Sequence, residues 1–114
     1  MQKIIFLKGL PASGKSTWAK QYCMENLFVV RINKDDIREQ LGNPPWSKAF
    51  ENKVLEIQRQ RGIDALAQGN SLIVDDTNFA DKHKIFWQDI AKKLLVGFEE
   101  KYFDVSVEEC IKST

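Results

Sequence analysis

The chain has 114 residues, of which 43% are hydrophobic and 29% are charged, and its formal net charge is +1. This length predicts one domain that buries about two-thirds of its unfolded surface, which is enough for a hydrophobic core. No run of about 18 apolar residues is present, so the sequence predicts no membrane-spanning helix. The near-neutral charge is not typical of a nucleic-acid-binding protein, and any such contact must come from local basic clusters.

The two cysteines, Cys23 and Cys110, show neither a metal-binding spacing nor the pattern of a disulfide framework. Two small buried thiols in a reducing cytoplasm are the simpler interpretation. The residues before the first predicted strand contain no apolar segment typical of a signal peptide. The sequence therefore favours a cytoplasmic location.

The first predicted element is a strand over residues 3–7, whose uninterrupted apolar run is typical of a parallel strand covered on both faces. It leads into Gly9-Leu10-Pro11-Ala12-Ser13-Gly14-Lys15-Ser16-Thr17, which fits the pattern G-x-x-x-x-G-K-S/T without mismatch. A helix is predicted over residues 15–25. The combination of strand, loop and helix favours a phosphate-binding loop over a plain strand-to-helix turn.

The chemistry of this loop explains its residue types. Glycines let successive backbone N–H groups turn toward one anion, and the N-terminus of the following helix adds its partial positive charge. Lys15 should reach the β- and γ-phosphates of ATP, and the Ser16 hydroxyl should bind Mg²⁺. The residues expected to contact the nucleotide are Gly9, Pro11, Ala12, Ser13, Gly14, Lys15, Ser16 and Thr17.

The second predicted strand covers residues 28–32 and is followed by Asn33-Lys34-Asp35-Asp36-Ile37-Arg38. Ligands bind at the C-terminal ends of strands in open parallel sheets. Asn33 could cap a short helix with the two acids in its first turn, and this capping role is the alternative to a functional site. The position at the strand end and the arginine one turn later favour a site.

Residues 41–46 predict a surface loop, and Ser47 is expected to cap a long helix that runs to about Gln68. The third predicted strand begins at Ser71 and finishes in Asp75 and Asp76. In a protein with a phosphate-binding loop, an acid at this place holds Mg²⁺ and its water.

A further helix is predicted to begin at Asp81 and to end at Gly97, with Trp87 as a packing ring and His83 as a solvated imidazole without chemistry. The fourth strand should cover residues 98–104 near a sheet edge because of its charges. A capping box predicts a last helix from about Val107. The core residues expected on the helix before the fourth strand are Ile85, Phe86, Ile90 and Leu94.

Four strands that alternate with helices predict a three-layer α/β/α fold with a parallel sheet. The chain also resembles the kinase domain of bacteriophage polynucleotide 5′-kinase and related phage P-loop kinases. By analogy with P-loop kinases, the strand order should be 2-3-1-4, with residues 1–114 forming one domain. The segments that carry the resemblance are residues 9–19, Ile32-Asn33-Lys34-Asp35-Asp36-Ile37-Arg38, Asp76-Thr77-Asn78 and Tyr102-Phe103-Asp104-Val105.

On the nucleotide side, the resemblance implies that Lys15 and Ser16 bind the phosphates of ATP and its Mg²⁺. Asp76 would support Ser16 and the metal site. Lys15 would act as a catalytic residue by stabilising charge on the transferred phosphoryl group.

On the acceptor side, the resemblance implies that Asp35 is the general base for the 5′-hydroxyl of RNA or DNA. Arg38 would hold the neighbouring phosphate of the acceptor, and Thr77 and Asn78 would contact the acceptor strand. The implied activity is ATP-dependent end repair of nucleic acid, in the host cytoplasm if the chain is phage-encoded.

The family's lid, with arginines that clamp the donor phosphates, should follow the fourth strand and its short helix. The sequence has no arginine after Arg61, so the domain is expected to lack the lid or to stop before it. Two alternatives therefore remain open. One is a P-loop kinase with a small-molecule acceptor, which the near-neutral charge favours. The other is a nucleotide-binding module with little turnover. The sequence does not indicate the oligomeric state.

Overall fold

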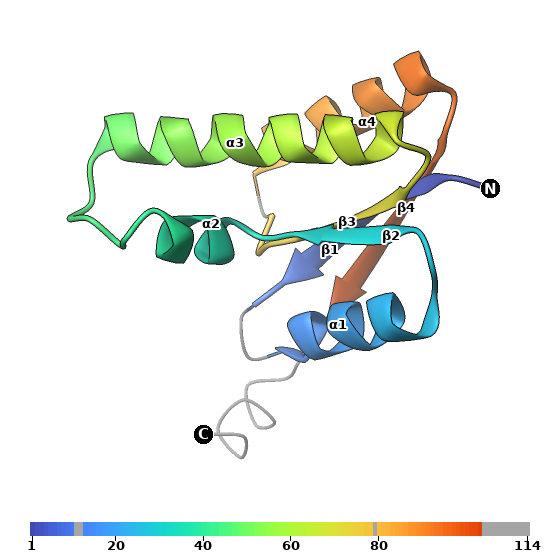
Figure 1. Ribbon diagram of the computed structural model, residues 1–114, viewed down its shortest axis with the longest axis horizontal. Helices are drawn as coiled ribbons and strands as arrows, with labels where there is room; N and C mark the ends of the chain where they lie inside the picture. The colour runs from blue at the N-terminus through green and yellow to red at the C-terminus, as the bar shows by residue number, and fades with distance from the viewer. Residues whose placement is uncertain (11–12, 79, 104–114) are drawn as a thin grey trace.

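The computed structural model describes residues 1–10, 13–78 and 80–103 (Figure 1). The last predicted helix, from about Val107, lies outside these residues. Strands and helices alternate along most of the described chain, as the apolar pattern predicts. The elements are β1 (Lys3–Gly9), α1 (Lys15–Glu25), β2 (Val29–Ile32), α2 (Lys34–Gln40), α3 (Lys48–Ala67), β3 (Ser71–Asp75), α4 (Asp81–Leu94) and β4 (Gly97–Phe103).

The strands form one parallel sheet in the order β2-β3-β1-β4, which confirms the predicted 2-3-1-4 order. β1 lies inside the sheet, where Phe6 pairs with Val74 of β3 on one side and with Glu100 of β4 on the other. This placement explains its uninterrupted apolar sequence, because a central parallel strand is covered on both faces. β4 is an edge strand, as its charged residues indicate.

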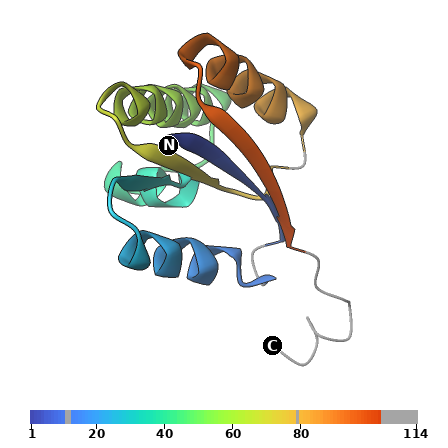
Figure 2. The same ribbon diagram turned by 90° about the vertical axis from the view of Figure 1, so that its right-hand side faces the viewer.

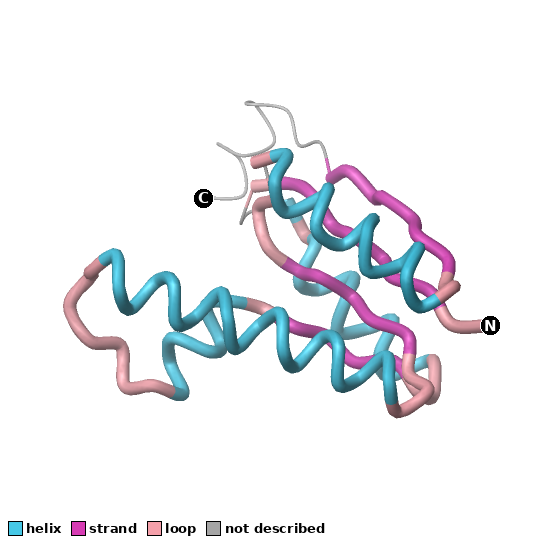
Figure 3. Tube along the Cα trace, turned by 90° about the horizontal axis from the view of Figure 1, so that it is seen from above, coloured by secondary structure: helices cyan, strands magenta, loops and turns pink. Residues whose placement is uncertain are grey.

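Helices cover both faces of the sheet, with α3 and α4 on one face and α1 on the other (Figure 2). Successive side chains of β1 alternate between these layers. Ile4 and Phe6 pack toward α3 and α4, whereas Ile5 and Leu7 pack toward α1. The three-layer α/β/α fold is therefore confirmed. Viewed from above, α3 extends beyond the strands toward α2 (Figure 3).

Two predicted helix caps are present. The side chain of Asn33 accepts a hydrogen bond from the backbone N–H of Asp36 at 3.0 Å, and that of Ser47 accepts one from Phe50 at 3.1 Å. Each bond satisfies an N–H group that has no partner within its own helix. The cap at Asn33 fixes the start of α2 directly after β2, and this places the α2 side chains at the C-terminal edge of the sheet.

The buried face of α4 differs from the predicted one. Trp87 and Ala91 are buried, while Phe86 and Ile90 pack against the same cluster and are only partly buried. Ile85 is 55% exposed, because two residues along a helix correspond to about 200° of rotation and Trp87 takes the inner position. The other residue expected in the core, Leu94, is 42% exposed in the last turn.

The end of α4 also differs from the expectation that Gly97 closes the helix. Leu95, in the left-handed region with φ 56°, is the C-cap, and Gly97 is the first residue of β4. The backbone N–H of Gly97 donates to the carbonyl of Gln2 at 3.1 Å. The glycine therefore marks the start of a strand pairing rather than the end of the helix.

A glycine in the middle of α3 makes room for the largest buried side chain of the described residues. Gly62 is buried, and a Cβ atom added to it would collide with the indole ring of Trp87. This close approach explains why a residue that weakens helices stands inside a long helix. None of the helices in the described residues has the length and apolar character needed to cross a bilayer.

Candidate active site

The phosphate-binding loop, residues 9–17, joins the end of β1 to α1. Gly14 has φ 85°, a left-handed conformation that favours glycine, and it forms the N-cap of α1. Within the described residues the α1 N-terminus has no side-chain cap, so backbone N–H groups remain for an anionic ligand. The Ser13 hydroxyl donates to the Leu10 carbonyl at 2.6 Å, which shapes the loop. Two predicted nucleotide contacts, Pro11 and Ala12, lie outside the described residues.

A cavity of about 220 Å³ opens beside this loop, at the C-terminal edge of the sheet. Its walls come from the start of α1, from α2 and from the segment after β3. Six of the predicted site residues therefore meet at one place although they are distant in sequence. The lining residues are Lys15, Ser16, Asn33, Lys34, Asp35, Arg38, Asp76 and Thr77.

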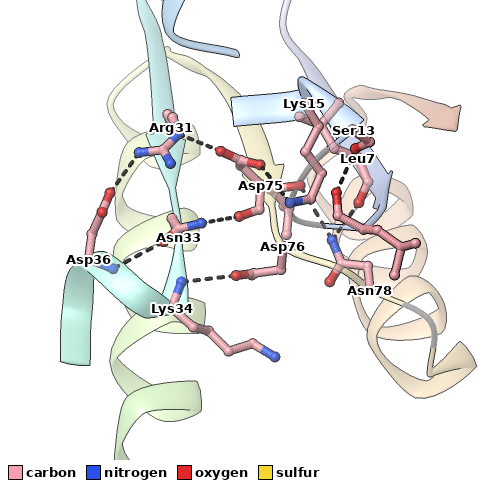
Figure 4. Close-up of polar contacts among 12 residues, drawn as sticks. Leu7, Ser13, Lys15, Arg31, Asn33, Lys34, Asp36, Asp75, Asp76 and Asn78 are labelled. Atoms are coloured by element: carbon pink, nitrogen blue, oxygen red, sulfur yellow. Dashed lines mark hydrogen bonds and ion pairs between the residues drawn. The ribbon is translucent and has the colours of Figure 1, made fainter. Parts of the chain in front are cut away.

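An ion-pair chain lies at the base of the site (Figure 4). The carboxylate of Asp75 is fully buried, with Lys15 Nζ 3.7 Å from Oδ1 and Arg31 Nε 2.6 Å from Oδ2. The Nη1 atom of Arg31 also lies 2.6 Å from Oδ2 of Asp36 in the first turn of α2. The sequence did not indicate Arg31, because one polar residue in a short strand is usually an exposed side chain.

Asp76, the predicted metal-supporting acid, lines the cavity. Its Oδ1 accepts the backbone N–H of Lys34 at 3.0 Å (Figure 4). Its Oδ2 accepts a hydrogen bond from Gln58 of α3. Burial raises the pKa of Asp76, while these two hydrogen bonds act in the opposite direction. Gln58 itself is buried, and only the spacing from Val54 and Gly62 at four-residue intervals could have revealed it as an inward-facing residue.

Asp35 and Arg38 lie one turn apart on α2 and form an ion pair, with 2.6 Å between Oδ1 and Nη1. The Asp35 side chain is 85% exposed. Arg38 is held from the other side by Glu51 of α3 at 2.7 Å, and hydrogen bonding to Arg38 lowers the pKa of Glu51. Arg38 is therefore fixed by two acids, whereas Asp35 has a free path to a ligand in the cavity.

The two residues after Asp76 are placed differently. Thr77 is exposed and lines the cavity, and its backbone carbonyl accepts the N–H of Gly9 at 3.1 Å. Asn78 is buried, and its side chain donates to the carbonyl of Leu7 at 2.6 Å (Figure 4). Asn78 thus ties the β3–α4 connection to the end of β1 and does not line the cavity, so its placement gives no support to the predicted acceptor contact.

His83 is not fully exposed to solvent. It is half-buried, and burial together with the positive charges of Lys34, Lys82 and Arg59 lowers its pKa to about 4. The expectation of a solvated imidazole is wrong in this respect.

Stability is expected to depend on pH through His83. Its pKa is about 4 in the folded chain and about 6.5 when unfolded. Between these values only the unfolded state binds the proton, so stability falls as the pH drops from 6.5 to 4. Because the ring is partly exposed, the loss should be about 1 kcal/mol. Urea unfolding at several pH values should show this extra loss of stability in the wild type and not in His83→Gln. Curves of unfolding free energy against pH that run parallel for the two proteins would contradict the prediction.

The parallel sheet and the phosphate-binding loop at its C-terminal edge define a P-loop nucleotide-binding domain. A family model described as an AAA domain matches residues 4–114, and the chain belongs to this family. Its relatives include kinases of different acceptors. The resemblance to P-loop kinases is confirmed at this level, whereas a phage origin is not shown.

Two relatives illustrate this range. The chain is 28% identical over 113 residues to L-seryl-tRNA(Sec) kinase of Methanococcus maripaludis, covering 96% of this chain and 44% of that protein. It is 26% identical over 125 residues to a protein assigned as a bifunctional polynucleotide kinase/RNA ligase in Autographa californica nuclear polyhedrosis virus, covering 97% and 17%. The chain thus spans less than half the length of these curated relatives.

Two solved structures can be superposed on this chain over nearly its whole length. A chain in a structure of a Pnkp1/Rnl/Hen1 complex superposes with a TM-score of 0.82 at 30% identity, covering 97% of this chain and 38% of that one. The Mycobacterium tuberculosis APS kinase CysC in complex with AMPPNP and APS superposes with a TM-score of 0.67 at 21% identity, covering 97% and 67%. The second similarity shows the shared fold alone.

Proposed function

We propose that the chain is the phosphotransfer domain of an ATP-dependent polynucleotide 5′-hydroxyl kinase that acts in the repair of RNA or DNA ends. The observation that carries the proposal is the single cavity that joins the phosphate-binding residues Lys15 and Ser16 to the acid–arginine pair Asp35 and Arg38. A kinase needs both groups within reach of one phosphoryl group. The polynucleotide kinase among the relatives supports the choice of acceptor.

On the donor side, the phosphates of ATP would lie on the loop N–H groups and Lys15. The hydroxyl of Ser16 and the carboxylate of Asp76 are oxygen ligands in the same cavity, and they fit the preference of Mg²⁺ for carboxylates and phosphates. These two residues would hold the ion. When bound, Mg²⁺ supplies neutralisation of charge on the phosphates.

On the acceptor side, Asp35 takes the proton of the 5′-hydroxyl. The hydroxyl oxygen forms a bond to the γ-phosphorus, and the bond from the γ-phosphorus to the bridging oxygen of ADP breaks. Arg38 binds the phosphate next to the acceptor hydroxyl. It is rigidly presented for this role, because Glu51 anchors its guanidinium from α3.

A second candidate is transfer to a small molecule, which the small cavity favours: about 220 Å³ is below the range of roughly 300–1,000 Å³ for ordinary ligand pockets. The polynucleotide kinase among the relatives and the 30% identity to a chain of the Pnkp1/Rnl/Hen1 complex instead favour a polynucleotide acceptor. We therefore place the polynucleotide acceptor first.

The test is transfer of labelled γ-phosphate from Mg-ATP to an oligonucleotide with a 5′-hydroxyl. Two controls accompany it: the variant Lys15→Ala, and the same oligonucleotide already carrying a 5′-phosphate. Labelled product that needs both Lys15 and a free 5′-hydroxyl would support the proposal. Phosphate release without labelled oligonucleotide would favour another acceptor. Nucleotide binding without turnover would favour the module with little turnover.

A further inference from the structure

Asp75 is the one fully buried acid in the described part of the chain. The hydrogen-bond partners of its two carboxylate oxygens differ. Oδ2 accepts a short hydrogen bond from Arg31, whereas Oδ1 has no hydrogen-bond partner within the described residues and faces Lys15 at 3.7 Å. A buried carboxylate is costly unless a counter-charge compensates it. The two cations beside Asp75 are Lys15 and Arg31, and they differ because Lys15 is also expected to bind phosphate.

Lys15 must be free to bind phosphate. If Lys15 were the sole counter-charge of Asp75, each nucleotide that drew it away would leave a buried, uncompensated carboxylate. Arg31 removes this conflict because its guanidinium is closer to Asp75 than the ammonium of Lys15 is, at 2.6 Å against 3.7 Å. The closer pair has the stronger attraction.

Arg31 is itself held in place by a second acid. Its guanidinium bridges Asp75 of β3 and Asp36 of α2 (Figure 4). The Arg31 side chain is 14% exposed. A planar guanidinium with several donors can serve two carboxylates at once, which the compact ammonium of a lysine does less well. The bridge also joins the end of β3 to the helix that carries Asp35 and Arg38.

We propose that Arg31 is a positioning residue that compensates the buried charge of Asp75 and so leaves Lys15 free to bind the phosphates of the nucleotide. This inference deepens the proposed function and rests on it only in that the loop binds nucleotide. It does not depend on which acceptor is phosphorylated. Arg31 acts through Lys15 and need not touch the ligand.

The experiment is calorimetric titration of ADP into the whole chain in EDTA, so that no metal ion contributes. Arg31→Gln should weaken ADP binding by about 10- to 100-fold, because Lys15 becomes the remaining counter-charge of Asp75. The double variant Arg31→Gln/Asp75→Asn should bind within about threefold of the wild type, since the charge that holds Lys15 is gone. A residue that only maintained the fold would not be rescued by removing its partner.

The matched control is Arg61→Gln, which removes one positive charge from an exposed position on α3 and should leave affinity unchanged. Arg31→Lys keeps the charge and serves if Arg31→Gln does not fold; it should bind ADP within a fewfold of the wild type. Circular dichroism verifies folding of each variant.

The proposal is overturned if folded Arg31→Gln binds ADP as tightly as the wild type, or if the double variant binds no better than Arg31→Gln. If Arg31→Lys is the variant used, affinity as low as that of Lys15→Ala would overturn it. The readout is ADP binding, so it is separate from the acceptor assay. A wild-type chain that binds ADP but phosphorylates no 5′-hydroxyl would overturn the proposed acceptor, while the Arg31→Gln and double-variant affinities would still decide the role of Arg31.

Discussion

Replacing Asp35 with asparagine is expected to lower kcat for phosphotransfer by about 10²–10⁴-fold while ADP affinity stays nearly unchanged. The carboxylate lines the cavity and is mostly exposed although it pairs with Arg38, so it can accept a proton from a bound hydroxyl. Asparagine keeps the shape of the side chain but cannot act as a base. Loss of the Asp35 carboxylate should therefore raise the energy of the transition state and leave the binding of the donor unchanged.

The measurement is steady-state kinetics on a 5′-hydroxyl oligonucleotide, combined with ADP titration of the same preparations. The control is Glu39→Gln, which removes an exposed acid from the same helix, outside the cavity lining. It should change kcat by less than about threefold. Full activity of Asp35→Asn would show that another group takes the proton, or that none is needed.

The second large effect is expected on stability. Trp87→Ala should lower the free energy of unfolding by about 3–5 kcal/mol. Trp87 is 2% exposed, stacks edge-on against Phe86 with 4.9 Å between ring centroids, and fills the space left by Gly62. The total free energy of unfolding of a native domain is about 5–15 kcal/mol, so much of the stability would be lost.

Urea unfolding followed by circular dichroism measures this loss. Trp46→Ala is the matched control, because Trp46 is 76% exposed and the same substitution there should change stability by less than about 0.5 kcal/mol. Equal midpoints for the two variants would mean that the core around Gly62 reorganises to fill the cavity.

Much of the fold could be predicted from local sequence signals. The apolar runs before Gly9 and Asp75 indicated buried parallel strands, and Asn33 and Ser47 marked the starts of two helices correctly. The strand order came from the resemblance to P-loop kinases rather than from these signals. The buried face of α4 was harder to predict, because Ile85 and Trp87 are both apolar. Only the packing against α3 decides which of the two side chains faces the core.

The candidate site could be predicted only where a motif carries it. The loop around Lys15 and the pair Asp35 and Arg38 were found in this way, and the structure brings them to one cavity. The partners that hold these residues were not found. Arg31 and Gln58 contact acids that are distant in sequence, and such contacts depend on the packing of three elements rather than on any local pattern.

The two consecutive acids at the end of β3 show what the sequence pattern alone does not resolve. The run of acids alone did not distinguish Asp75 from Asp76, and only the resemblance to P-loop kinases selected Asp76. Successive residues at the end of a strand point to opposite sides. Asp75 pairs in register with Leu7 and turns its side chain to Lys15 and Arg31, whereas Asp76 turns to Gln58 and the cavity. The three-dimensional register, which the sequence does not contain explicitly, assigns each acid its partners.

The central place of β1 has a consequence for synthesis of the chain on the ribosome. Its sheet partners β3 and β4 come later in the sequence, and roughly 60 residues separate the end of β1 from the start of β3. At about 5–20 residues per second, the nascent strand waits some 3–12 s for its first partner. During this interval an uninterrupted apolar segment has no sheet to join, so it is exposed to non-native contacts until β3 has been made.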